Sequence, residues 1–199
     1  MEHLLRSDFV NHHGLPACTF DYHQVDFDSF EIDDINRRLQ VRVGITNGMA
    51  KYQNPHAKQV AIIDYDGFLT STPHAFQQGK KRCDVILHTT TDASHFLLNE
   101  LKDRIPITEV LTKATAQILA TLNELHTVPS IVNFIATFAT KKCCYCNRQS
   151  TAPASITATT AFNRVSTLAP QGFLLANTDI QNFGFELWEY SGNQTIILS

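Results

Sequence analysis

Polar and apolar residues alternate in several short segments of the chain, and a period of two is typical of β-strands with one buried face. Two residue pairs, Asn47-Gly48 and Gly192-Asn193, favour tight turns between such strands. The pattern predicts strands over residues 40–46, 60–65, 183–190 and 195–198.

The period becomes helical between residues 108 and 126. Apolar residues recur there every three or four positions, which gives a helix one apolar face. Thr108 is suited to the helix start, and Pro129 lies past its end. The residues of the predicted apolar face are Leu111, Ala114, Ile118, Leu122 and Leu125.

A shorter helix is predicted over residues 28–39. Asp28 and Glu31 are spaced as a capping box, the pattern that often starts a helix. Ile32, Ile35 and Leu39 would form its buried stripe.

Two further segments lack a helical period. Residues 131–140 are mainly apolar and predict a buried strand, while residues 150–160 are rich in Ala, Ser and Thr and predict a loop or a weak helix. The order of helix, strands, helix and strand favours an α/β fold (mixed α+β), in which helices flank a central mixed sheet. With 199 residues, 43% of them hydrophobic, and no separating linker, we expect residues 1–199 to form a single domain.

Ionisable residues interrupt one otherwise apolar hairpin over residues 80–102. Glu100 and Lys102 follow the run Phe96-Leu97-Leu98 and, being two residues apart on a strand, share one face. A turn near residues 91–92 would place Asp84 opposite Asn99 or Glu100. Two carboxylates and a lysine beside a sheet predict a site for a divalent cation and a water.

The spacing of Asp84, Glu100, Leu101 and Lys102 resembles the core of the PD-(D/E)XK nuclease superfamily, whose fold is restriction-endonuclease-like. The hairpin segments CDVIL and FLLNELK are also similar to uncharacterised bacterial proteins with this core. The resemblance covers residues 28–140 as the core, with residues 150–199 as a C-terminal extension packed on it. The Pro that often precedes the Asp is replaced by Cys83.

The resemblance implies roles for these residues. Asp84, Glu100 and the main-chain carbonyl of Leu101 would bind Mg²⁺ or Mn²⁺, and Lys102 would be the catalytic base or charge stabiliser. Supporting roles would fall to a glutamate of the first helix and to polar residues of the helix after the motif. The corresponding residues here are Glu31, Gln117 and Lys113.

The resemblance also implies the substrate. A metal-dependent nuclease would hydrolyse phosphodiester bonds in DNA or RNA, with Lys80, Lys81 and Arg82 contacting phosphates. The net charge of −3 gives no global basic surface, so such contacts would be local. Nucleases of this type often form homodimers, and the oligomeric state stays open. A non-catalytic binding protein on the same fold is the main alternative.

A second resemblance leads to a different function. Residues 60–72 are similar to the first motif of haloacid-dehalogenase phosphatases, in which Asp64 would be the nucleophile and Asp66 the general acid. That motif normally lies on the first strand of its fold, whereas about sixty residues precede it here, and the later acidic pair of that family has no counterpart in the sequence. An Asp-Gly turn after a strand explains the same residues.

The cysteines predict a cytoplasmic setting. Their number, five, is odd and their spacing fits no disulfide framework. Cys143, Cys144 and Cys146 contain one C-x-x-C pair, for which zinc would need ligands such as His126 or Cys18, and buried thiols are the simpler interpretation. The first ten residues lack a signal-peptide pattern, and no apolar run predicts a membrane span.

Overall fold

The computed structural model describes residues 1–36, 38–105, 108–149 and 171–199. Segment 150–160, predicted as a loop or weak helix, lies outside these ranges. The helices are α1 (Glu2–Leu4), η1 (Leu5–Phe9), α2 (Val10–His12), α3 (Tyr65–Thr70), α4 (His74–Gln77), α5 (Thr108–Leu125), α6 (Pro129–Ala136) and α8 (Thr178–Gln181).

The strands belong to two sheets. In the described ranges, seven strands form the large sheet in the order β1-β5-β6-β7-β8-β10-β9, and four form the small sheet in the order β11-β4-β2-β3. Their bounds are β1 (Tyr22–Val25), β2 (Ser29–Ile35), β3 (Arg38–Val43), β4 (Ala50–Gln53), β5 (Val60–Asp64), β6 (Val85–Thr89), β7 (His95–Lys102), β8 (Thr140–Asn147), β9 (Phe173–Leu175), β10 (Glu186–Ser191) and β11 (Ile196–Ile197).

The large sheet is mixed. Strands β1, β5, β6 and β7 are antiparallel neighbours, whereas β8 runs parallel to β7 and β10 runs parallel to β8. A parallel pair needs a crossover, and here α5 and α6 lie between β7 and β8 along the chain. The prediction of a mixed sheet flanked by helices is confirmed.

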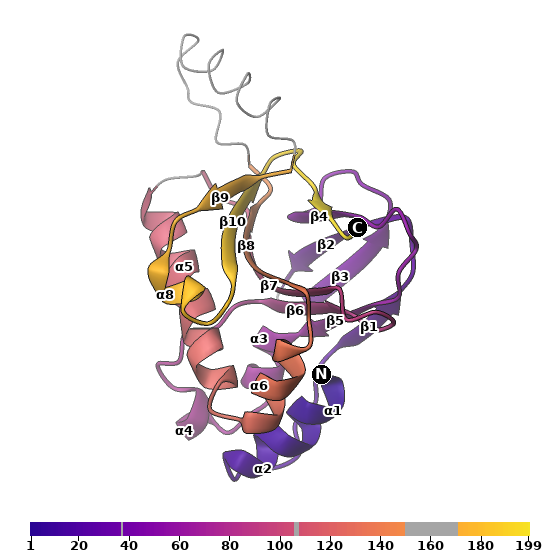
Figure 1. The fold of residues 1–199 in the computed structure, drawn as a ribbon. Coiled ribbons are helices and arrows are strands. Elements are labelled where there is room, and N and C mark those ends of the chain that lie inside the picture. Colours follow the sequence, from indigo (N-terminus) through magenta and orange to yellow (C-terminus); the bar gives the residue numbers. More distant parts are fainter. Residues whose placement is uncertain (37, 106–107, 150–170) are drawn as a thin grey trace.

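Each face of the large sheet is covered by a different layer (Figure 1). Phe96 and Leu98 of β7 pack in a core with α5, α6 and the N-terminal helical segment. Leu97 and Leu101, on the other face, pack in a second core with residues of the small sheet. Alternation along β7 therefore sends every second side chain to the helices, which decides where its ionisable residues lie.

Strands replace the helix predicted over residues 28–39. Segment 29–35 is β2, paired with β3 on one side and with β4 on the other. Phe30 and Ile32 point into the core between the sheets, whereas Glu31 and Asp33 alternate with them. The helix prediction is wrong because the carboxylates of Glu31 and Asp33 find buried partners in the sheet, which outweigh a local capping pattern.

A helix replaces the strand predicted over residues 131–140. Pro129 starts α6, where its missing N–H costs no hydrogen bond. Ile131 and Ile135, four residues apart, are the buried positions, so the apolar residues follow a helical period. The buried strand of this region is β8, which begins at Thr140.

The remaining predicted elements agree more closely with the structure. Helix α5 matches the prediction for residues 108–126, and β5 matches the strand over 60–65. Strand β10 begins only at Glu186, and the Asp66-Gly67 turn is part of helix α3. No helix in the described ranges is long and apolar enough to cross a membrane.

Candidate active site

The predicted hairpin places Asp84 beside Glu100. Val85 pairs with Asn99 across β6 and β7, and the Asp84 amide donates to the Asn99 carbonyl at 3.1 Å. Asp84 is therefore opposite Glu100 in the antiparallel register. Side chains at facing positions are about 5 Å apart at Cβ, so the two carboxyl groups are neighbours on one face.

This face is the one that the helices cover. Glu100 and Lys102 alternate with Leu101, which packs in the core between the sheets, and they follow Leu98, which packs against the helices. Glu100 is fully buried, with 0% of its surface exposed, and the Lys102 side chain is 20% exposed. A carboxylate in such a place needs a partner of opposite charge.

Two contacts fix the carboxylates. The Lys102 ammonium forms an ion pair with Oε1 of Glu100. The Leu101 amide donates to Oδ2 of Asp84 at 2.6 Å. Oε2 of Glu100 is buried and has no hydrogen-bond partner in the part of the chain that the structure describes. A buried carboxylate oxygen without a partner is costly unless a ligand satisfies it.

Burial and repulsion shift the protonation of both acids. Burial raises the pKa of Asp84 to about 6, although Lys102 and the Leu101 amide oppose the shift. Burial, together with the neighbouring Asp84 carboxylate, raises the pKa of Glu100 well above its usual value. The two acids therefore resist ionising together, and a cation beside them would relieve this repulsion.

A small cavity adjoins Asp84. Its volume is about 10 Å³, close to the space one water molecule occupies, and it is lined by Asp34, Leu39, Asp64, Asp66 and Asp84. The tip of the small sheet contributes Asp34 and Leu39, and the start of α3 contributes Asp66. Carboxylates from three separate segments thus line one cavity at the start of β6.

The donor set fits a hard cation. Two carboxylates and a main-chain carbonyl are oxygen ligands of the kind that Mg²⁺ and Mn²⁺ take, with waters completing the shell. The unpartnered Oε2 of Glu100 provides a free ligand atom. No group of three or more His, Cys, Asp or Glu side chains in the described ranges is arranged to hold a metal ion, so such a site would depend on the Leu101 carbonyl and water.

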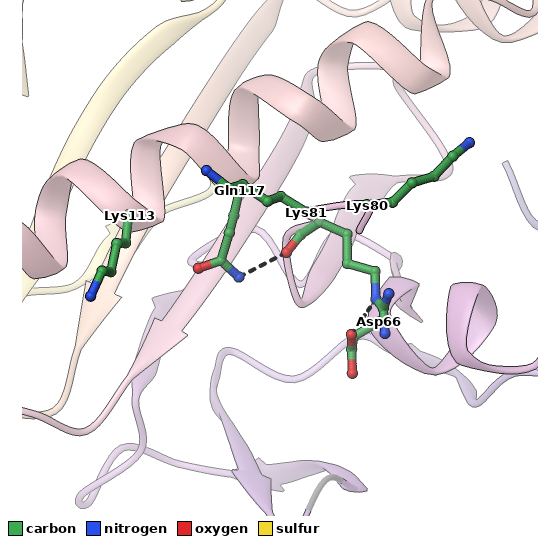
Figure 2. A pocket seen from close by; sticks show the side chains of 6 residues that line it. Asp66, Lys80, Lys81, Lys113 and Gln117 are labelled. Carbon is green, nitrogen blue, oxygen red and sulfur yellow. Dashed lines mark hydrogen bonds and ion pairs between the residues drawn. The ribbon is translucent and has the colours of Figure 1, made fainter. Parts of the chain in front are cut away.

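A larger cavity lies next to the Asp84–Glu100–Lys102 centre and is lined by basic residues. We call this cavity the basic pocket. Its volume is about 480 Å³, and its walls are the segment before β6, the face of α5 and Asp66 of α3 (Figure 2). The lining residues are Asp66, Lys80, Lys81, Arg82, Lys113 and Gln117. The predicted supporting residues Gln117 and Lys113 and the predicted phosphate contacts therefore lie in one place.

Glu31 lies elsewhere. The helix predicted to carry it is replaced by strand β2. There the Glu31 carboxylate accepts hydrogen bonds from the amides of Thr46 (2.8 Å) and Gly48 (2.7 Å) and pairs with Arg42. Although burial acts in the opposite direction, these hydrogen bonds lower its pKa. The structure brings Glu31 into a buried network of the small sheet and not beside Asp84 or Glu100.

The residues of the possible phosphatase and zinc sites have contacts that stabilise the fold. Asp64 caps α3 by accepting from the Gly67 amide at 2.8 Å, and Asp66 pairs with Arg82 at 2.5 Å. Cys143, Cys144 and Cys146 are fully buried thiols of β8. Burial raises the pKa of all three, so they remain uncharged and are poor zinc ligands as they stand.

The sequence did not indicate two neighbours of the centre. Asp66 lines both cavities, and its only signal was the Asp-x-Asp pattern that suggested a phosphatase. Tyr145 of β8 pairs in register with Glu100, and burial raises its pKa to about 12. The register of β8 could not be predicted because the strand itself was missed.

Comparisons with known proteins add no relative. No protein-family model matches the chain, no curated protein matches it, and no solved structure matches it. The geometry of the chain's own residues therefore carries the functional argument.

Proposed function

We propose that the protein is a metal-dependent nuclease that hydrolyses phosphodiester bonds in DNA. The observation that carries the proposal is the convergence of Asp84, Glu100 and Lys102 on the helix-covered face of the large sheet. The basic pocket beside them supports a polyanionic substrate. The PD-(D/E)XK resemblance supports the same conclusion from the sequence.

Each residue has a defined part in this proposal. Asp84, Glu100 and the Leu101 carbonyl would hold Mg²⁺ or Mn²⁺, and the ion would supply polarisation of a phosphate and activation of a water. The Leu101 amide keeps the Asp84 carboxylate in place. Lys102 neutralises Glu100 and places a positive charge where charge develops on the phosphate oxygens.

Cleavage by substituted proteins tests the proposal. With Mg²⁺ or Mn²⁺, the wild-type protein is expected to cut DNA, and Asp84→Asn, Glu100→Gln and Lys102→Ala are each expected to cut at least about 100-fold more slowly. The first two weaken the proposed metal site, and the third removes a positive charge that would stabilise the transition state. Gel assays on linear and circular DNA, with RNA in parallel, measure the rates. Circular dichroism checks that each variant is folded.

Two matched controls make the result specific. Asp179→Asn removes an exposed carboxyl of α8, and Lys141→Ala removes a lysine at the opposite end of β8 from Asn147; both are expected to cut at the wild-type rate. Wild-type rates in Asp84→Asn and Lys102→Ala would refute the nuclease. Calorimetric binding of Mn²⁺ without any cleavage would instead favour the non-catalytic binding protein.

A further inference from the structure

The basic side chains around the pocket differ in whether they have an ion-pair partner. The Lys80 ammonium pairs with Glu124 at 2.6 Å and lies 3.5 Å from the centre of the Phe76 ring. Arg82 pairs with Asp66 at 2.5 Å. Lys81 has no ion pair or hydrogen bond with any residue that the structure describes. The Lys81 ammonium is therefore available to pair with an anion in the pocket.

Lys113 is the second available cation. Its partner Glu109 is one turn away on α5 at 2.6 Å, and both side chains are more than two-thirds exposed. An exposed pair of this kind contributes little stability, so Lys113 exchanges Glu109 for a stronger anion at small cost. In Figure 2, Lys113 and Gln117 project from α5 on the side where the Lys81 segment passes, while Lys80 extends away from them.

The wall that carries Lys81 is fixed in position. The Gln117 amide donates to the Arg82 carbonyl at 3.0 Å, and the Cys83 amide donates to Thr121 Oγ1 at 2.8 Å. Both bonds fasten the segment before β6 to α5, so the lysines start from a rigid backbone. Ligand binding would then order the lysine side chains but not the backbone that carries them.

The pocket is also close to the proposed centre. Arg82 and Asp84 are two residues apart, so their backbones are separated by at most about 7 Å. Asp66 lines both the basic pocket and the small acidic cavity. A group in the basic pocket would therefore lie beside whatever is bound at Asp84.

We propose that the basic pocket binds a phosphate group of the substrate strand adjacent to the bond that is cut, with Lys81 and Lys113 as its direct partners and Asp66 opposing it. This inference rests on the proposed function for the identity of the strand. The cavity of about 480 Å³ is within the range of small-ligand sites, so a single nucleotide fits the volume.

Metal-free nucleotide binding tests the inference separately from catalysis. Adenosine 5′-monophosphate and inorganic phosphate are titrated by calorimetry in the presence of a chelator. Lys81→Ala is expected to weaken binding about tenfold, because a charge-assisted hydrogen bond is lost. Asp66→Asn is expected to strengthen binding, since Asp66 supplies the carboxylate among the described lining residues. Lys141→Ala is the matched control and is expected to bind as the wild type does.

The opposite signs of the two variants separate a binding role from a structural one. A fold defect would weaken binding in both, so weaker binding by Asp66→Asn, or unchanged binding by Lys81→Ala, would overturn the inference. Oligonucleotides with and without a 5′-phosphate distinguish a terminal phosphate from an internal one, and either result supports the pocket. If the wild-type protein cuts DNA but binds neither adenosine 5′-monophosphate nor inorganic phosphate, phosphate binding in the basic pocket is refuted and the nuclease proposal stands. If it binds these probes but does not cut DNA, the nuclease proposal is refuted and phosphate binding in the basic pocket stands.

Discussion

Single residues at the centre are held in costly states. Glu100 is completely buried with one oxygen unpartnered, and burial raises the pKa of the adjacent Asp84 to about 6. The folded protein thus gains no stability from placing these acids together. Perturbed acids in contact with a lysine are typical of functional sites, where the cost is tolerated for the chemistry.

The stability of Asp84→Asn tests how much free energy the folded protein loses when the Asp84 carboxyl ionises. Asp84 has an ordinary pKa of 3.8 and a folded pKa of about 6, so between these values the folded protein binds a proton that the unfolded chain does not. The free energy of unfolding therefore falls as the pH rises through this window. Asp84→Asn does not ionise and is expected to be more stable than the wild type above pH 6, by at most about 3 kcal/mol, and equal to it below pH 4.

Urea unfolding at a series of pH values measures the difference. Asp84 as a whole residue is partly exposed, so solvent screening makes 3 kcal/mol an upper limit. Asp179→Asn, an exposed acid, is expected to follow the wild-type profile. A variant at Asp84 that is less stable than the wild type at pH 8 would show that the carboxylate stabilises the fold.

At the scale of elements, helix α5 positions the site through hydrogen bonds to the segment before β6. Its buried face is formed by Ala114, Ile118 and Leu122, as the sequence pattern predicted. Thr121, which is 1% exposed, adds a polar contact within that face by accepting from the Cys83 amide. This hydrogen bond joins the helix to the residue immediately before Asp84.

Removing the hydrogen bond between the Cys83 amide and Thr121 Oγ1 is expected to destabilise the folded protein. Thr121→Val keeps the side-chain shape but leaves the buried Cys83 amide without an acceptor, which is expected to lower the free energy of unfolding by about 1–3 kcal/mol. Thr112→Val, on an exposed position of the same helix, is the matched control and is expected to change it by less than about 0.5 kcal/mol. Denaturant unfolding checks both, and equal effects would show that helix propensity alone is responsible.

At the scale of the whole molecule, the large sheet is enclosed between helices and the small sheet. The C-terminal strands join both sheets: β10 extends the large sheet beside β8, and β11 pairs with β4 of the small one. A fully buried polar contact crosses the interface, where the Tyr52 hydroxyl donates to Asn99 Oδ1 at 2.9 Å. Asn99 precedes Glu100, so this contact ties the small sheet to the strand that carries the centre.

Tyr52→Phe tests the contribution of this contact to the assembly of the two sheets. Both residues are 0% exposed, and Nδ2 of Asn99 already lacks a partner in the described part of the chain. Losing the hydroxyl is expected to cost about 1–3 kcal/mol of unfolding free energy. Tyr22→Phe, at a half-buried hydroxyl of β1, is expected to cost less than about 0.5 kcal/mol, and a similar loss in both variants would contradict the role of the Asn99 contact.

Local patterns determined the parts of this protein that depend on neighbours in the sequence. The face of α5, strand β5 and the hairpin with Asp84 opposite Glu100 follow from periods and turns within about twenty residues. The convergence of Asp84, Glu100 and Lys102 was predictable because one hairpin contains all three.

Tertiary structure decided what depends on distant partners. Glu31 and Asp33 became buried strand residues because Arg42, Thr46 and Arg148 reach them in the folded chain, and no local signal indicates those contacts. The acidic cavity and the basic pocket likewise combine segments that are far apart in sequence. Burial, long-range pairing and charge compensation are properties of the assembled sheets, and a single segment does not contain them.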